Sequence, residues 1–196
     1  MQVVSIVLAA GFSRRLGSAK QMARLGDRTL LELAVKTALE AGLTPVFVVL
    51  REERKTAFCV ANLDSPRSEA AVVTVVNPEA AEGMGSSVRA GVRAAEGAAG
   101  VVVLACDQPA VTAEHLRELA RGGDEVVAST YAGRNGVPAY FPARMFPELL
   151  ELRGDAGARG LLQTARAVEL PGGELDIDTV EDLERAVRLY GRPPGL

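Results

Sequence analysis

The stretch VVSIVLAAGFSRRLGSAK, residues 3–20, decides the fold of this chain. Its first half is an almost unbroken run of aliphatic residues, which is typical of a strand buried on both faces of a parallel sheet. Small residues follow at positions 9–11, and Arg14, Arg15 and Lys20 then place positive charge in one loop. Small side chains at the end of a strand let a ligand approach the backbone, whose amide groups suit phosphate oxygens. We therefore expect this loop to bind an anion, such as a nucleotide phosphate.

The glycine spacing of this loop differs from two common nucleotide-binding fingerprints. Gly11 and Gly17 do not give the G-x-G-x-x-G pattern of dinucleotide-binding folds, and the chain contains no G-x-x-x-x-G-K-[ST]. A Rossmann-type first loop or a plain tight turn is the structural alternative to a phosphate-binding loop. The residues of the loop alone leave these alternatives open.

Length and composition favour one soluble domain. The 196 residues suffice to bury a sizeable core, so we expect a single domain over residues 1–196. The net charge of −3 gives no reason to expect nucleic acid or an acidic membrane as a partner, and the apolar run at residues 3–10 is too short to span a bilayer. The two cysteines, Cys59 and Cys106, support neither a disulfide framework nor a zinc site, so we expect a cytoplasmic protein.

The rest of the chain alternates apolar strand patterns with helical patterns. This alternation predicts βαβ units with right-handed crossovers, and hence a three-layer, Rossmann-like α/β fold with a mostly parallel sheet. Residues 125–131 and 137–141 are expected to form a hairpin around a turn at residues 133–136. The other expected strands are residues 45–50, 71–76, 100–106 and 167–170, and the expected helices are residues 29–41, 51–61, 86–96, 143–150 and 178–190, with two more after Thr112 and from Ala158.

Small or polar residues follow three of these strands. They are residues 9–20, residues 77–87 and residues 107–109. In open α/β sheets ligands bind beyond the carboxyl ends of the strands, so we expect these segments to form one site. Asp107 follows the most apolar strand, where a carboxylate is a good ligand for a hard cation such as Mg2+. A turn-forming aspartate before Pro109 is the alternative.

Two of these segments resemble one enzyme family. Residues 8–20 resemble the L-A-A-G-x-S-x-R-[ML]-G-x-x-K signature of the MobA-like nucleotidyltransferases, and residues 104–109 resemble the family's L-x-x-D-x-P segment, whose aspartate binds metal. The resemblance implies a fold of the nucleotide-diphospho-sugar transferase type. It also implies that Leu8, Ala9, Ala10, Gly11, Ser13 and Lys20 bind the nucleotide and that Arg15, Lys20 and Asp107 are catalytic.

Further motifs are similar to the branch of the family that contains molybdenum cofactor cytidylyltransferase. Residues 77–87 resemble its N-P-x4-G-M-x2-S segment, which implies that Asn77, Gly83 and Ser87 lie at the nucleotide. Residues 136–138 and 154–159 also match, which implies that Gly136, Pro138, Asp155 and Arg159 bind the acceptor. From the residues alone, an Asn-Pro turn and a solvated arginine on a surface glycine turn are the alternatives.

The resemblance implies a reaction and its partners. A nucleoside monophosphate, CMP from CTP, would pass to a phosphorylated pterin-type acceptor, the molybdenum cofactor, with release of pyrophosphate. The metal would be Mg2+, with Mn2+ as the alternative, and the protein partner would be a molybdoenzyme or its chaperone. CTP is favoured because Ala10 stands where the guanylyltransferase branch has glycine. The alternatives are a guanylyltransferase of the same family, a non-catalytic assembly protein that binds nucleotide, and a dinucleotide-dependent oxidoreductase.

Asp178 has two competing interpretations. Residues 176–183 resemble the family's D-x-D-T-x-E-D-L segment, in which the second aspartate, here Asp178, joins Asp107 at the metal. The same residues also predict a helix start with Asp178 as the N-cap and Glu181 completing a capping box. Of the remaining reactive residues, His115 is expected at the surface rather than in catalysis, and Cys106 is expected to be a buried neighbour rather than a nucleophile.

Overall fold

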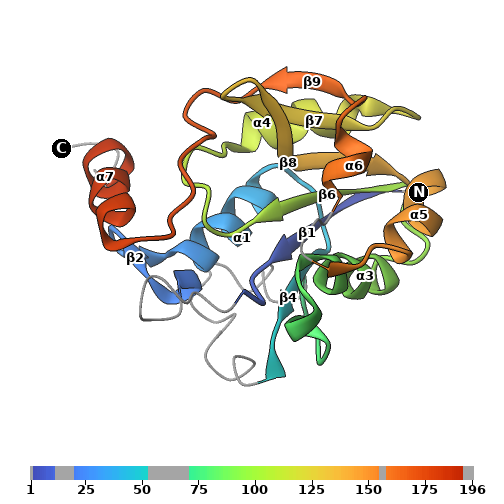
Figure 1. The fold of residues 1–196 in the computed structure, drawn as a ribbon, viewed down its shortest axis with the longest axis horizontal. Helices are drawn as coiled ribbons and strands as arrows, with labels where there is room; N and C mark the ends of the chain where they lie inside the picture. The colour runs from blue at the N-terminus through green and yellow to red at the C-terminus, as the bar shows by residue number, and fades with distance from the viewer. Residues whose placement is uncertain (1, 12–19, 53–70, 155–157, 192–196) are drawn as a thin grey trace.

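The computed structural model describes residues 2–11, 20–52, 71–154 and 158–191 (Figure 1). Within them, seven strands form one sheet in the order β5-β4-β1-β6-β8-β7-β9. The first four strands in this order, β5, β4, β1 and β6, run parallel to one another. Strand β8 is antiparallel to both β6 and β7, and β9 is parallel to β7. This arrangement confirms the predicted mostly parallel α/β fold. The strands are β1 Val3–Leu8, β4 Val46–Leu50, β5 Val72–Val76, β6 Gly100–Ala105, β7 Val127–Tyr131, β8 Arg134–Pro142 and β9 Arg166–Glu169.

The sheet lies between two helical layers, as the alternating pattern predicts. Val7 of β1 belongs to the apolar cluster that includes α1 and α4, whereas the adjacent Ile6 belongs to the cluster that includes α3, α5 and α6. Helix α3 packs so closely on the sheet that a Cβ atom at Gly91 would lie 2.4 Å from the Ile6 side chain. The helices are α1 Leu30–Glu40, α3 Met84–Ala94, α4 Ala113–Leu119, α5 Phe146–Leu150 and α6 Arg159–Leu162.

Two helices begin where their capping residues predict. The Thr29 hydroxyl accepts a hydrogen bond from the amide of Glu32, and the Glu32 carboxylate accepts one from the amide of Thr29, which is a complete capping box for α1. The Thr112 hydroxyl accepts from the amide of His115 at 3.2 Å and so caps α4. The side chains thus satisfy backbone amides that the first turn of a helix leaves without partners.

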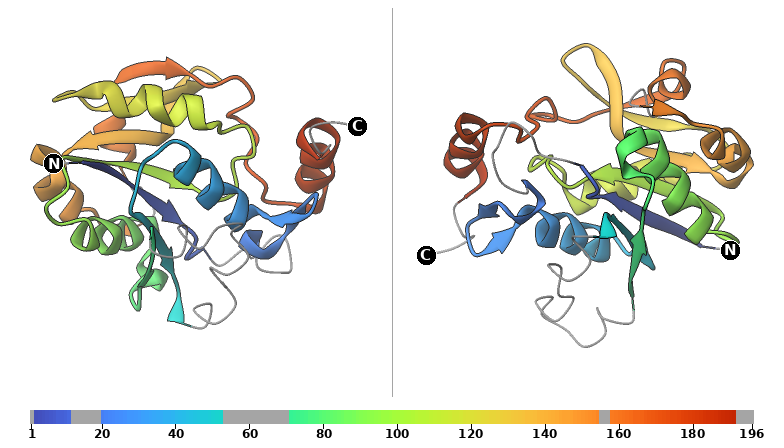
Figure 2. Two further views of the ribbon diagram at one scale, coloured as in Figure 1. Left: turned by 180° about the vertical axis from the view of Figure 1, so that it is seen from behind. Right: turned by 60° about the horizontal axis from the view of Figure 1, so that its bottom comes forward.

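One part of the fold was not predicted. Before α1 the chain forms a short 3-10 turn, η1 (Lys20–Met22), and a small hairpin of β2 (Arg24–Leu25) and β3 (Arg28–Thr29). Helix α7 (Val180–Tyr190) packs beside this hairpin at the edge of the molecule (Figures 1 and 2). The two elements share a third apolar cluster, whose buried members are Leu25, Leu30, Leu175, Ile177 and Ala186. Strands of two residues are too short to show the alternation that identifies a strand in a sequence.

Other differences from the predictions are local. Strand β8 begins at Arg134, so Gly136 lies within the strand, and the predicted turn at residues 133–136 is wrong. The chain instead reverses at Ala132 and Gly133, which have positive φ angles of 48° and 73°. Most of the helix expected at residues 51–61 lies outside the described residues. None of the described helices has the length and apolar character needed to cross a bilayer.

The expectation that His115 lies at the surface is wrong. His115 is only 7% exposed, and its Nε2 lies 2.7 Å from the Ser129 hydroxyl. Because Ser129 donates its single hydroxyl hydrogen to the Pro138 carbonyl at 2.6 Å, Nε2 is the donor in its bond with Ser129. Burial lowers the pKa of His115, since the charged imidazolium loses solvation. His115 is therefore a neutral core residue that ties α4 to β7.

We expect His115 to make stability depend on pH below about 6.5, the ordinary histidine pKa. In that range the unfolded chain takes up a proton that the buried neutral His115 does not, so stability falls as the pH falls. The variant His115→Gln keeps an amide donor for Ser129 but cannot titrate. Urea unfolding at pH 7 and pH 5 should show a smaller loss of stability for this variant than for the wild type. An equal loss in both proteins contradicts the prediction.

Candidate functional site

A cleft of about 220 Å³ lies between the carboxyl ends of β1 and β6 and the amino end of α3. It is here called the β1 cleft. Most of its lining comes from the three segments that the sequence singles out, and it lies at the edge of the sheet where α/β folds bind ligands. The described residues that line it are Leu8, Ala9, Ala10, Gly11, Lys20, Gln21, Ala80, Gly83, Met84, Ser87, Ala105, Cys106 and Asp107.

The small residues after β1 form one wall of this cleft. Ala9 and Ala10 are buried, and the amide of Ala9 donates to the carbonyl of Val49, which fixes the chain at the end of the sheet. A Cβ atom at Gly11 would meet no atom of the described residues within 4 Å, so within that part of the chain this glycine faces open space. These positions match the prediction of a loop that a ligand can approach closely. The predicted residues Ser13 and Arg15 lie outside the described residues.

The first turn of α3 forms the opposite wall. Gly83 has a φ angle of 111°, which favours glycine, and it precedes the helix at the cleft. The Asn77 amide donates to the hydroxyls of Ser86 at 2.9 Å and Ser87 at 3.0 Å, and its carbonyl oxygen accepts from the amide of Glu79 at 3.0 Å. Gly83 and Ser87 therefore line the cleft, whereas Asn77 is not among the described lining residues and positions Ser87 from behind.

Three charged side chains from distant parts of the chain meet beside the cleft. The Lys20 ammonium donates to Asp107 Oδ2 and to Asp178 Oδ1, the latter at 2.8 Å. Lys20 begins η1, Asp107 follows β6, and Asp178 precedes α7. The side chains of Lys20 and Asp107 are 19% and 11% exposed, whereas that of Asp178 is 41% exposed. The pair of Lys20 with Asp107 is therefore the better shielded from solvent, and its attraction is the less screened.

The protonation states at this centre follow from its geometry. Burial disfavours the charged form of Lys20, but the charge and hydrogen bonds of Asp107, and then those of Asp178, outweigh burial and raise the pKa of Lys20 above its ordinary value. Lys20 is therefore positively charged at neutral pH. Burial raises the pKa of the Cys106 thiol, and the nearby charge of Asp107 adds to this effect. Cys106 is consequently a protonated, buried thiol, as predicted, and not a nucleophile.

The two carboxylates fit a metal ion that is shared with a ligand. Asp107 Oδ1 is buried and has no hydrogen-bond partner among the described residues, which is costly unless another group completes its environment. Within the described ranges no three histidine, cysteine, aspartate or glutamate side chains are grouped to hold a metal. Mg2+ is commonly bound by one or two carboxylates together with substrate phosphates and water. With only two carboxylates, Asp107 and Asp178 fit a site of this kind and not one in which protein groups alone hold the metal.

A second pocket, of about 180 Å³, adjoins the β1 cleft and is here called the β8 pocket. Both cavities are lined by Met84, Ala105 and Asp107, so Asp107 stands where they meet. The described residues that line the β8 pocket are Met84, Ala105, Asp107, Gln108, Tyr131, Arg134, Asn135, Gly136, Val137, Ala158, Arg159, Leu162 and Asp176. Gly136 and Arg159 are therefore at this pocket, in line with the sequence prediction.

The other predicted residues of this region lie elsewhere. Pro138 does not line the β8 pocket in the described part of the chain, and Asp155 lies outside the described residues. Arg134 and Asn135 line the pocket but were not predicted. Their signal in the sequence is weak, because they flank an ordinary hairpin turn and reach the site only through the pairing of β8 with β6.

The wall of the β8 pocket contains a polar network. Gln108 donates through Nε2 to the Tyr131 hydroxyl at 3.2 Å and to the carbonyl of Gly173 at 3.4 Å, and Tyr131 donates to the carbonyl of Val137 at 3.0 Å. Gln108 Oε1 is buried and finds no hydrogen-bond partner in the part of the chain that the structure describes, which leaves an acceptor for a ligand N–H group. Burial, followed by the charge of Asp107, raises the pKa of Asp176 to about 6. The pocket thus offers the hydrogen-bonding groups of this network together with the cationic side chains of Arg134 and Arg159.

The structure separates the two interpretations of Asp178. Thr179, not Asp178, is the N-cap of α7: its hydroxyl accepts from the amide of Asp182, and the Asp182 carboxylate accepts from the amide of Thr179. The capping box is therefore shifted by one residue from the predicted pair of Asp178 and Glu181, and that prediction is wrong. The Asp178 carboxylate instead bonds to Lys20, beside Asp107.

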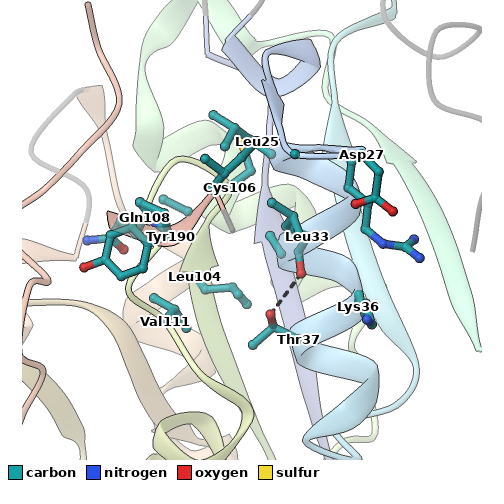
Figure 3. Close-up of a pocket in the computed structure, with 17 residues that line it drawn as sticks. Leu25, Asp27, Leu33, Lys36, Thr37, Leu104, Cys106, Gln108, Val111 and Tyr190 are labelled. Carbon is teal, nitrogen blue, oxygen red and sulfur yellow. Dashed lines mark hydrogen bonds between the residues drawn. The ribbon is translucent and has the colours of Figure 1, made fainter. Parts of the chain in front are cut away.

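A larger pocket, of about 510 Å³, lies between α1, the β2–β3 hairpin and the end of β6, and is here called the α1 pocket (Figure 3). Tyr190 and Gln108 lie at one side of it, and Lys36 and Thr37 lie at the other. Its walls are largely apolar, and Thr37 donates its hydroxyl hydrogen to the carbonyl of Leu33. None of the predicted site residues that the structure describes lines the α1 pocket. The β1 cleft, although it is smaller, is therefore the candidate active site.

Comparison with known proteins identifies relatives of the whole chain. Residues 5–170 match the family described as MobA-like NTP transferase domain. The chain is 37% identical over 197 residues to the purine catabolism protein PucB of Bacillus subtilis, and the match covers 95% of this chain and 96% of PucB. It is 32% identical over 201 residues to nicotine blue oxidoreductase of Paenarthrobacter nicotinovorans, with 93% and 95% of the two chains covered.

Two further relatives bear on nucleotide and metal. Over 141 residues the chain is 34% identical to a probable molybdenum cofactor guanylyltransferase of Opitutus terrae, and the match covers 69% of this chain and 64% of the relative. The crystal structure of Rv0371c from Mycobacterium tuberculosis in complex with manganese superposes with a TM-score of 0.73 and 29% identity, covering 96% of this chain and 99% of Rv0371c.

Proposed function

This chain belongs to the family of MobA-like NTP transferase domains, and from that premise we propose that it transfers CMP from CTP to the phosphate of a pterin-type acceptor and releases pyrophosphate. The observation that carries the proposal is the position of Asp107, which lines both the β1 cleft and the β8 pocket and is joined there by Lys20 and Asp178. A nucleotide in the β1 cleft and an acceptor in the β8 pocket bring their reacting groups together at Asp107. One domain, residues 1–196, suffices for this activity.

In the proposed reaction an oxygen of the acceptor's phosphate attacks the α-phosphorus of the nucleotide. The bond from that phosphorus to the bridging oxygen breaks, and pyrophosphate leaves opposite the attacking oxygen. No protein nucleophile is needed, in agreement with the protonated state of Cys106. Backbone amides at residues 10 and 11 and the Lys20 ammonium bind phosphate oxygens, and Arg15 adds positive charge as these oxygens develop negative charge.

Asp107 and Asp178 would hold Mg2+, with Mn2+ as the alternative, through the carboxylate oxygens that face one another across Lys20. When bound, the ion supplies positive charge to the phosphate oxygens during transfer. The partnerless Asp107 Oδ1 and the manganese complex of the related Rv0371c support a divalent ion at this position.

We place the acceptor in the β8 pocket, where Arg134 and Arg159 supply guanidinium groups for its phosphate. The side-chain carbonyl oxygens of Gln108 and Asn135 would accept hydrogen bonds from the N–H groups of a pterin ring, since the amide nitrogens of both residues already donate to protein groups. Gly136 lines the same pocket. Pro138 and Asp155 are assigned to acceptor binding only because the family motifs that contain them imply this role. A molybdoenzyme or its chaperone is the protein that would receive the product.

Replacement of Arg159 by alanine should weaken acceptor binding. A charged hydrogen bond contributes roughly 1.5–3 kcal/mol, so we expect the acceptor KM to rise by at least about tenfold. The nucleotide KM should stay unchanged, because Arg159 lines the β8 pocket and not the β1 cleft. Steady-state kinetics with each substrate varied in turn measures both constants. Arg166→Ala, on the outer strand β9, is the control, and a rise in the nucleotide KM alone contradicts the assignment.

The preference for CTP rests on Ala10. This residue is buried and lines the β1 cleft, so its Cβ atom occupies space that glycine would leave to a larger base. Discrimination by shape amounts to roughly 1–3 kcal/mol, so we expect a preference of tens- to hundreds-fold. With CTP and GTP competing in one reaction, cytosine should be incorporated preferentially, and Ala10→Gly should reduce the preference. Preferential incorporation of guanine by the wild type contradicts the proposal.

The reaction is tested by pyrophosphate release from CTP, GTP, ATP and UTP, with and without molybdenum cofactor. We expect release that requires the cofactor and is fastest with CTP. Fastest release with GTP would support the guanylyltransferase alternative, which the relative from Opitutus terrae favours. Nucleotide binding without release would support the assembly protein. Consumption of NADH or NADPH without pyrophosphate would support the oxidoreductase, the activity named for the relative from Paenarthrobacter nicotinovorans.

A further inference from the structure

One ammonium group stands between the two carboxylates that are assigned to the metal. Lys20 Nζ contacts Asp107 Oδ2 and lies 2.8 Å from Asp178 Oδ1, so it bridges oxygens from chain segments more than seventy positions apart. The Asp107 side chain is 11% exposed and that of Lys20 is 19% exposed, so water screens this contact only in part.

An ammonium and a divalent ion cannot both occupy this position. Both would contact the same two carboxylate oxygens, and two cations at that separation repel strongly where solvent is partly excluded. A metal held by Asp107 Oδ2 and Asp178 Oδ1 must therefore displace Lys20 Nζ from these two oxygens. The charged hydrogen bonds that Lys20 loses then oppose metal binding, unless Lys20 gains other anionic partners.

The triphosphate of a nucleotide supplies such partners. Lys20 lines the β1 cleft together with Gly11 and Ser87, so a short swing of its flexible side chain carries the ammonium from the carboxylates into the cleft. Phosphate oxygens there would accept the hydrogen bonds that Asp107 and Asp178 give up. The cost of releasing Lys20 is then small when nucleotide is present and large when it is absent.

We propose that Lys20 acts as the resident cation of the Asp107–Asp178 site and thereby keeps metal out until a nucleotide binds. The inference rests on the proposed function, since it takes the two carboxylates as the metal site. By thermodynamic linkage, the nucleotide tightens metal binding and the metal tightens nucleotide binding by the same factor. Lys20 thus determines the order in which ligands enter, in addition to contacting the phosphates.

The test is direct binding of Mn2+ in the absence of nucleotide, followed by the EPR signal of free Mn2+. Wild type should bind weakly, and Lys20→Gln should bind at least about tenfold more tightly, because no ammonium has to be displaced. Lys20→Arg keeps the charge and should bind as weakly as wild type. Arg24→Gln removes one positive charge from the neighbouring hairpin, where Arg24 bonds to the carbonyl of Asp27, and should change the affinity by less than about threefold.

The outcomes separate this inference from the proposed function. If Asp107→Asn abolishes Mn2+ binding while Lys20→Gln equals wild type, the metal site stands and the role of Lys20 is overturned. If Asp107→Asn leaves Mn2+ binding unchanged, the metal site itself is wrong and both proposals fail. Thermal unfolding gives a second readout, since Mn2+ should raise the Tm of Lys20→Gln more than that of wild type. If Lys20→Gln does not fold, the wild type provides the test. Equal affinity of the wild type for Mn2+ with and without a non-hydrolysable CTP analogue overturns the inference.

Discussion

Asp107→Ala is expected to fold and to lose roughly 10³-fold in pyrophosphate release at saturating Mg2+. The carboxylate ends the central strand β6, touches Lys20 and lines both cavities, so both proposed substrates depend on its charge. The surrounding strand is held by pairing with β1 and β8, which the substitution leaves intact. Turnover and the far-ultraviolet circular dichroism spectrum, measured on the same preparation, test activity and folding together.

Two further variants make this result specific. Asp107→Asn keeps the shape and one hydrogen-bond acceptor but removes the charge, so it should be nearly as inactive as the alanine variant. Asp124→Ala removes an exposed carboxylate that is not among the described residues lining the β1 cleft or the β8 pocket, and it should retain full activity. Pyrophosphate release near the wild-type rate in Asp107→Asn would show that the charge of Asp107 takes no part in the reaction.

Asp178→Ser should produce the second-largest effect, with turnover reduced about tenfold to hundredfold and more Mg2+ required for half-maximal rate. Serine is an uncharged and weak ligand for Mg2+, so it cannot replace the carboxylate that faces Asp107 across Lys20. Its melting temperature should stay near that of wild type, because Thr179 and Asp182 form the capping box of α7. Rates measured over a Mg2+ series, together with thermal unfolding, distinguish these effects.

Thr179→Ala is the matched control for this variant. It removes the hydroxyl that caps α7 and should lower stability by about 1 kcal/mol while leaving the Mg2+ requirement unchanged. The opposite pattern, in which Asp178→Ser melts early and keeps its normal Mg2+ requirement, would assign Asp178 to the helix rather than to the metal.

The parts of the fold that could be predicted are those with a strong local signal. The apolar runs of β1 and β6 identify central strands, and Asp107 is conspicuous because it directly follows the most apolar stretch of the chain. The β2–β3 hairpin gives no such signal, since each strand has two residues and its stability comes from packing against α7. His115 was misplaced for a related reason, because a single polar residue in a short helix does not show which face is buried.

The candidate site divides in the same way. Ala9, Gly11 and Lys20 follow one strand along the chain, so their closeness follows from the sequence. Arg134 reaches the β8 pocket only because β8 pairs antiparallel with β6, a tertiary fact that no local pattern contains. At the start of α7 the capping box predicted from Asp178 and Glu181 lies one residue away from the observed box of Thr179 and Asp182, because the Asp178 carboxylate bonds to Lys20 instead of the helix.

The third apolar cluster has a consequence for local opening of the protein. Its five buried residues join the hairpin, the first residue of α1, the loop before α7 and α7 itself, and the α1 pocket separates part of this group from β6. Regions with few buried contacts open at a lower free energy than the rest of a fold, so this unit exchanges its amide hydrogens before the central sheet does. Since η1 carries Lys20 and the loop before α7 carries Asp178, each such opening would take the charged centre apart while Asp107 stays in place after β6.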